Sequence, residues 1–107
     1  MRQLLIVETR DAADHKDPAR MVELAAGMNR GGVPTTIFLA ENGAFNARDA
    51  GDRPLQRAIA DGVRVAVDRF ALEERAIDAD LLGDGIAVAD VGLIVDRLAD
   101  GACVMWR

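Results

Sequence analysis

The stretch Val63-Arg64-Val65-Ala66-Val67, followed at once by Asp68, decides the fold prediction. Its alternating valines favour a β-strand, and the strand ends on a carboxylate. Two earlier stretches have the same character, the apolar run Leu4-Leu5-Ile6-Val7 and the β-branched and aromatic run Thr35–Leu39. Uninterrupted apolar runs are typical of strands that are covered on both faces, as in parallel sheets. The sequence therefore predicts several buried strands in one sheet.

Helical segments alternate with these strands. Asp17 and Pro18 begin the first helix, with Asp17 as N-cap and Pro18 at the first helical position, where its missing N–H costs nothing. Gly31-Gly32 ends this helix. A second helix begins at Asp52-Arg53-Pro54 and ends at Gly62. Each strand is thus followed by a polar loop and a helix.

The last third of the chain continues the alternation. We expect Arg69–Ala76 to be helical, with Phe70 as its largest apolar anchor, and Ile86–Val88 to be a short strand. A final helix, capped by Asp90, ends at Gly101. Helical spacing predicts that its buried face consists of Val91, Ile94, Val95 and Leu98.

The order of elements predicts the architecture. Strands that alternate with helices form a parallel sheet with helices on both faces, joined by right-handed crossovers. We therefore expect one domain over residues 1–107, a three-layer α/β/α sandwich whose mostly parallel sheet has about five strands. The last of these strands is Ala102–Trp106.

Composition excludes several classes of protein. The net charge of −5 argues against nucleic-acid binding, which needs concentrated Lys and Arg. No apolar run approaches the roughly 18 to 20 residues of a membrane span. The apolar stretch near the N-terminus is too short for a signal peptide, and the single cysteine fits a reducing compartment. We expect a cytoplasmic protein that binds neither nucleic acid nor membrane.

Several short strings along the chain match one known family in type and order. They are Leu5-Ile6-Val7 with Thr9-Arg10, Gly31-Gly32-Val33, Phe38-Leu39 with Asn42-Gly43-Ala44, Gly62–Val67, and the terminal strand that finishes in Trp106. With them the chain resembles the DsrE/DsrF-like family, small α/β proteins of sulfur relay and sulfur oxidation. The resemblance covers nearly the whole chain and implies a DsrEFH-like fold.

The same resemblance bears on function. Active members carry a cysteine just after the third strand, which accepts a sulfane sulfur as a persulfide, and here Asp68 stands at that position. A carboxylate cannot carry persulfide sulfur. The chain is similar to family subunits that lack the cysteine and serve as structural or partner subunits. The resemblance implies a homo-oligomer, a trimer or hexamer, with a protein partner as an alternative. We expect no cofactor.

Cys103, the only thiol, offers a second hypothesis. A sulfur carrier needs an accessible thiolate beside a positive charge, and Arg107 is the nearest cation in sequence. Cys103 lies between Ala102 and Val104 in an apolar strand, so we expect a buried structural cysteine. Trp106 suits either a subunit interface or the interior of the monomer.

A third hypothesis places a small anion or metabolite at the carboxyl ends of the strands, where open α/β sheets bind ligands. The candidate binding residues are Arg10, Asn42, Asp68 and Arg69. Glu8 would share this rim, and neighbouring carboxylates would raise one another's pKa. The alternative for Arg10 is a surface ion pair, and the alternative for Asp68 is an N-cap for the helix that follows.

The first loop also holds potential metal ligands. Glu8, Asp11, Asp14 and His15 are of suitable types, but they follow no recognised ligand spacing. We predict no metal site there. His15 is best explained as a solvated loop residue.

Overall fold

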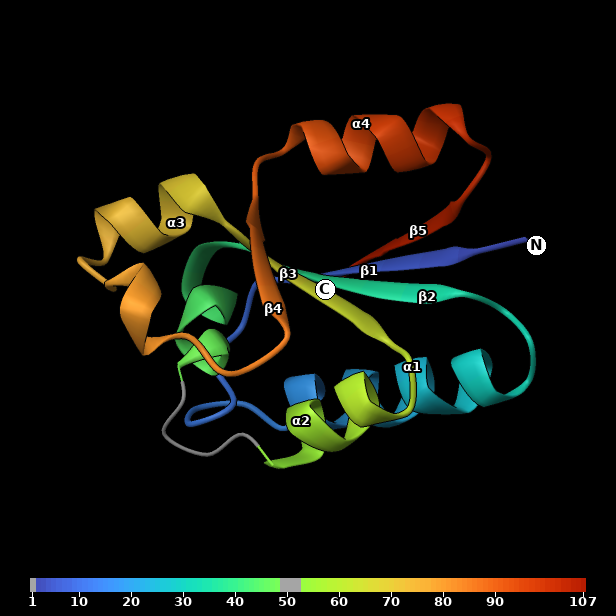
Figure 1. The fold of residues 1–107 in the computed structure, drawn as a ribbon, viewed down its shortest axis with the longest axis horizontal. Helices are drawn as coiled ribbons and strands as arrows, with labels where there is room; N and C mark the ends of the chain where they lie inside the picture. The colour runs from blue at the N-terminus through green and yellow to red at the C-terminus, as the bar shows by residue number, and fades with distance from the viewer. Residues whose placement is uncertain (1, 49–52) are drawn as a thin grey trace.

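A computed structural model describes residues 2–48 and 53–107 and contains a five-stranded sheet (Figure 1). All neighbouring strands pair in parallel, in the order β4-β3-β2-β1-β5. This arrangement confirms the predicted fold class. The strands are β1 (Leu4–Glu8), β2 (Thr35–Leu39), β3 (Arg64–Asp68), β4 (Ile86–Ala89) and β5 (Cys103–Trp106).

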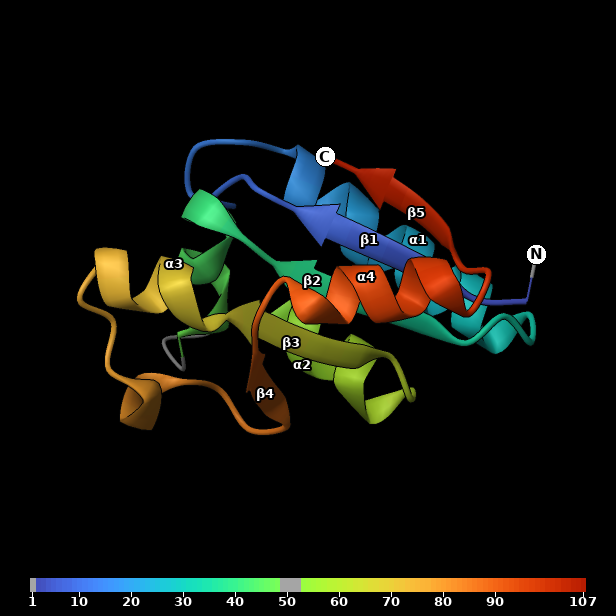
Figure 2. The ribbon, with the colours of Figure 1, turned by 90° about the horizontal axis from the view of Figure 1, so that it is seen from above.

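Helices form a layer on each side of the sheet. They are α1 (Asp17–Arg30), α2 (Arg53–Ala60), α3 (Arg69–Glu74) and α4 (Gly92–Ala99), with the 3₁₀ helices η1 (Glu41–Ala47) and η2 (Ala79–Leu81). Helices α1 and α2 cover one face, whereas α4 crosses the other (Figures 1 and 2). None of the helices within the described ranges combines the length and apolarity needed to span a membrane.

Strand order explains this division. Strands β1 to β4 are added in one direction, but β5 pairs with β1 on the side away from β2. Because parallel crossovers are right-handed, reversing the direction places α4 on the opposite face from α1 and α2. A single helix of eight residues therefore covers that face.

The two faces differ in how well they are packed. Leu4 and Ile6 of β1 join the larger core beneath α1 and α2, while Leu5 and Val7 join a smaller cluster beneath α4. This alternation follows from the two-residue period of a strand. Val65 and Val67 of β3 face the larger core. The predicted burial of these strands on both faces is confirmed.

Of the four residues expected on the buried face of the last helix, only Ile94 packs against the sheet. Helix α4 contains no fully buried residue, and it contacts the sheet through Leu93 and Ile94. Val95 is 63% exposed and Leu98 is 55% exposed, although both were expected to face inward. Phe70, the expected anchor of α3, is likewise 64% exposed. The helical spacing identified a stripe of apolar residues, but most of that stripe faces outward and not toward the sheet.

Helix starts also depart from the predicted caps. The residue before α1 is Lys16, and Asp17 belongs to the helix, where its carboxylate pairs with Arg107. Asp68 does occupy the N-cap position of α3, but its side chain caps no backbone N–H. Asp90 accepts a hydrogen bond from the N–H of Gly92, one residue earlier than a regular cap. The start of the second helix at Asp52 lies outside the described residues.

Close packing of backbones, rather than a turn, requires glycine at position 43. Gly43 lies in η1 at the carboxyl end of the sheet, and its N–H donates to the carbonyl of Ala40. A Cβ atom at this position would overlap the carbonyl oxygen of Glu8. Gly43 thereby sets how closely η1 approaches the end of β1.

We expect Gly43→Ala to lower the free energy of unfolding by about 2 kcal/mol or more, because backbone must move to admit the methyl group. Gly31→Ala is the matched control, since a Cβ there makes only ordinary contacts with helix carbonyls. Urea denaturation of both variants measures the difference. Equal stability of the two variants would contradict the close approach.

Candidate functional site

Two carboxylates end strands that lie on either side of β2, and they face opposite layers. Glu8 is the last residue of β1 and points with Leu4 and Ile6 toward α1. Asp68 is the last residue of β3 and points with Ala66 toward the α4 side. The expected rim shared by Glu8 and Asp68 is therefore wrong. Each carboxylate lines a separate cavity.

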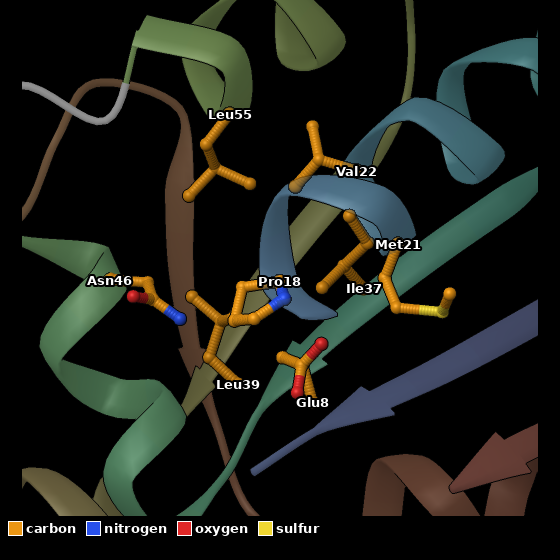
Figure 3. A pocket seen from close by; sticks show the side chains of 8 residues that line it. All are labelled: Glu8, Pro18, Met21, Val22, Ile37, Leu39, Asn46 and Leu55. Carbon is orange, nitrogen blue, oxygen red and sulfur yellow. The ribbon is translucent and has the colours of Figure 1, made fainter. Parts of the chain in front are cut away.

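The cavity of Glu8 is small and mostly apolar (Figure 3). Its volume is about 10 Å³, counted as space open to the centre of a water molecule, which admits roughly one water. Figure 3 shows the Glu8 carboxyl directed toward this space. The walls are Pro18, Met21, Val22, Ile37, Leu39, Asn46 and Leu55.

Glu8 is poorly supplied with hydrogen-bond donors. The residue is 2% exposed, and its Oε2 accepts a hydrogen bond of 3.2 Å from the N–H of Arg10. Its Oε1 is buried and has no partner among the described residues. Burial in the cavity, followed by interaction with the carboxylate of Asp17, raises the pKa of Glu8 to about 7. Protonation turns Oε1 into a donor that can be directed at Asp17, so the neutral acid suits this site.

Asp17 stays ionised because a cation holds it. The Arg107 guanidinium donates to Asp17 through Nη2 at 2.6 Å and through Nε at 3.2 Å. This hydrogen bond is the main cause that lowers the pKa of Asp17. The contact joins the start of α1 to the residue after β5, across 90 positions of sequence. Glu8 and Asp17, both buried, thus form one cluster with the exposed Arg107, and we call it the Glu8 cluster.

Asn46 fixes the loop above this cluster. Its Nδ2 donates to the carbonyl of Arg10, and its Oδ1 accepts from the N–H of Ala12, each at 2.9 Å. The carbonyl of Asp11 then accepts from His15 and turns the chain into α1. These bonds hold the loop that carries the N–H donor to Glu8.

A larger cavity lies at the carboxyl ends of the strands on the α4 side, and we call it the strand-end pocket. Its volume in the same measure is about 240 Å³. Asp68, 7% exposed, forms part of its floor together with the buried ring of Phe38. The remaining walls are Ala40, Glu41, Phe70, Ala71, Glu74, Val91, Ile94 and Trp106.

Of the four predicted binding residues, only Asp68 lines this pocket. The backbone N–H of Arg10 donates to Glu8, and its carbonyl accepts from Asn46. Asn42 accepts a hydrogen bond from Nε of Arg75 at 3.1 Å. Arg69, the first residue of α3, is exposed. Arg10, Asn42 and Arg69 do not share the walls of the strand-end pocket with Asp68.

Cys103 is exposed, so the expected buried cysteine is wrong. It is the first residue of β5, an edge strand that pairs with β1 on one side only. In parallel strands the first residues lie at the amino edge of the sheet. Cys103 is therefore at the opposite end of the sheet from both cavities. The loop acids and His15 also form no group of three metal-ligating residues among the described side chains.

Sequence reasoning missed the partners within the Glu8 cluster. Asp17 before Pro18 has the pattern of a helix cap, which concealed its role as a counter-ion. Arg107 is separated from Asp17 by nearly the whole chain, and no local pattern links them. A signal existed at Glu8, because a charged residue directly follows the uninterrupted apolar run of β1.

Comparison with solved structures finds this fold in proteins of distant sequence. The ychN protein of E. coli has a TM-score of 0.82 and 15% identity, with 100% of both chains covered. The protein of unknown function MTH1491 from Methanobacterium thermoautotrophicum has a TM-score of 0.79 and 19% identity over 100% of both chains. BT1422 from Bacteroides thetaiotaomicron, also of unknown function, has a TM-score of 0.73 and 20% identity over 99% of this chain and 95% of its own. Identities at this level establish the fold alone. No protein-family model and no curated protein matches the sequence.

The raised pKa of Glu8 predicts a pH-dependent stability. The folded chain keeps the Glu8 proton up to a pH of about 7, whereas the unfolded chain releases it near 4.5. The folded state then binds more protons, so this contribution to stability falls as pH rises through that window. Glu8→Gln copies the neutral acid and should be more stable than wild type above pH 7, by roughly 2–3 kcal/mol.

Denaturation of both proteins from pH 4 to pH 9 measures this difference, which should be small at the acid end and grow toward neutral pH. Asp17→Asn tests the contribution of Asp17 to the raised pKa of Glu8. It removes the neighbouring negative charge and should lower that pKa. Parallel stability profiles for wild type and Glu8→Gln would show that Glu8 is ionised in the folded protein.

Proposed function

We propose that this protein is a DsrE-like subunit that assembles with copies of itself and does not relay sulfur at the strand-end pocket. The observation that carries the proposal is the apolar outer surface of α4 on an otherwise well-packed fold. The family resemblance, which implies trimers or hexamers, supports the same conclusion. A homo-oligomer is also the commonest form of association for soluble proteins.

The apolar outer surface is continuous. Val95 and Leu98 belong to α4, and Val91 is its N-cap residue in helical conformation. The separations of four and three residues place the three side chains on one stripe. Val91 also borders the strand-end pocket together with Phe70 and Trp106, and these two side chains are more than 60% exposed. We call Val91, Val95, Leu98, Phe70 and Trp106 together the α4 surface. A helix that is apolar on its inner and outer sides is typical of a buried helix.

Beside α4, part of the sheet face is left open. A cavity of about 340 Å³ lies against β3 and β4, with small side chains from Ala66, Ala87 and Ala89 and with Leu93 of α4. Parallel sheets are normally covered on both faces. A second copy that brings an apolar helix to this groove would complete the missing part of the layer.

Asp68 supports the absence of sulfur relay at the strand-end pocket. A carboxylate oxygen cannot hold a sulfane sulfur, and the only thiol lies at the other edge of the sheet. Asp68 lines the strand-end pocket, where it can bind a ligand but cannot act as a sulfur nucleophile. The subunit would then contribute assembly and binding surface to sulfur-linked metabolism.

Light scattering during size-exclusion chromatography tests the assembly. We expect wild type to elute at a multiple of 11.5 kDa, and the double variant Val95→Asp/Leu98→Asp to elute nearer the monomer mass. Burying one such side chain contributes about 1.5–3 kcal/mol, so two introduced charges should weaken association roughly 100-fold or more.

Leu81→Asp is the matched control, because Leu81 is an equally exposed leucine on η2, away from α4. It should leave the oligomer mass unchanged. A strict monomer for wild type at high concentration would overturn the proposal, and equal effects of the two substitutions would remove α4 from the interface.

A second candidate function is favoured by the exposure of Cys103, which leaves its sulfur accessible for carrier chemistry. In this role the Cys103 thiolate would accept one sulfane sulfur from a persulfide donor and later yield it to an acceptor thiol. The pocket at the other edge of the sheet would take no part in the transfer.

For the carrier function we expect mass spectrometry to find one added sulfur atom on wild type after incubation with a persulfide donor, and its loss after addition of an acceptor thiol. Cys103→Ser should gain none. Unmodified wild-type protein under conditions that modify a reference carrier would exclude the carrier function.

A further inference from the structure

We propose that the strand-end pocket binds a small organic cation, an ammonium group on a compact apolar body. Three kinds of observation lead to this ligand class: an unpaired buried carboxylate, an acidic set of neighbours, and an aromatic wall. The site is formed within one chain, so the proposal does not rest on assembly.

The carboxylate is Asp68. The residue is 7% exposed, and it lines the cavity from the end of β3. Its side chain makes no hydrogen bond or ion pair with the residues that the structure describes. Its oxygens are not among the fully enclosed side-chain atoms, so the carboxylate stays open to the pocket that it lines. A ligand with a positive charge can pair with this carboxylate, which has no partner among the described residues.

Neighbouring charges select the sign of the ligand. Glu41 and Glu74 also line the pocket, and none of its described walls is a Lys, Arg or His. Arg75 offers Glu74 only a loose contact of 3.8 Å between Nη1 and Oε1. An anion would meet three like charges here, so the small-anion hypothesis made from Arg10 and Arg69 does not suit this pocket.

The apolar walls select an organic ion. The fully buried Phe38 lines the pocket together with Ile94, Phe70 and Trp106. Aromatic faces attract ammonium groups and also pack against hydrocarbon. The acidic side chains form no metal-ligating group among the described residues, whereas an ammonium group needs only one carboxylate in contact. The volume of about 240 Å³ suits a compact molecule rather than a polymer.

Phenethylamine, phenethyl alcohol and phenylacetate are matched probes, because they share an aromatic body and differ in charge. Calorimetric titration of the full chain should give binding of the amine, at least about tenfold weaker binding of the alcohol, and none of the acid. Asp68→Asn should lower the affinity for the amine about tenfold or more and leave that for the alcohol nearly unchanged. Asp84→Asn, at an exposed acid outside the pocket, is the matched control and should bind the amine as wild type does.

Equal affinities for amine and alcohol, or an amine affinity unaffected by Asp68→Asn, would overturn the proposal. Retained affinity of Asp68→Asn for the alcohol shows that the variant is folded and its pocket intact. The titration is repeated with Val95→Asp/Leu98→Asp, whose substituted residues do not line the pocket. We expect that variant to bind the amine. Binding by a protein that no longer assembles would show that the pocket works independently of the oligomer.

Discussion

Strand β5 pairs with β1 on the side away from β2, and much of the structure depends on this placement. The chain must return across the sheet to reach that position, and a right-handed return places α4 on the otherwise uncovered face. Helices α1 and α2 share one face, while the eight residues of α4 serve the other alone. The thin layer, the open groove beside β4 and the exposed stripe of α4 all follow from this topology.

The two-residue period of a strand gives the two acidic strand ends different chemistry. Glu8 falls on the well-packed side, where burial and Asp17 raise its pKa and favour the neutral acid. Asp68 falls on the thinly covered side, where a cavity wide enough for a ligand remains. A shift of one residue in the register of either strand would move its carboxylate to the opposite face of the sheet. A carboxyl group thus keeps its proton in one layer, at Glu8, and is a candidate ligand for a cation in the other, at Asp68.

The fold was predictable because the strands are mostly apolar or β-branched and because α1, α2 and α4 are each followed by a glycine within two residues of their ends. Helix α3 ends at Glu74 without one. Gly32, Gly62 and Gly101 have positive φ angles, as helix ends of this kind require. The orientation of α4 was not predictable, because apolar residues surround most of the helix and its spacing fits either direction. The Asp17–Arg107 contact was also beyond reach, since it joins residues 90 positions apart that carry no shared pattern. Cys103 was misjudged because an apolar strand is buried only if neighbours cover it, and β5 is an edge strand.

The two proposals for the α4 side are linked through shared residues. Val91, Phe70 and Trp106 belong to the α4 surface and also border the strand-end pocket. A second copy that covers them would exclude water from Asp68 and strengthen its attraction to a bound ammonium group. The same covering without a ligand would leave the carboxylate more deeply buried and uncompensated, which is costly. Assembly would therefore raise the affinity for the cation, and by reciprocity the cation would favour assembly to the same extent. The carboxylate of Asp68 would then make oligomerisation responsive to a ligand.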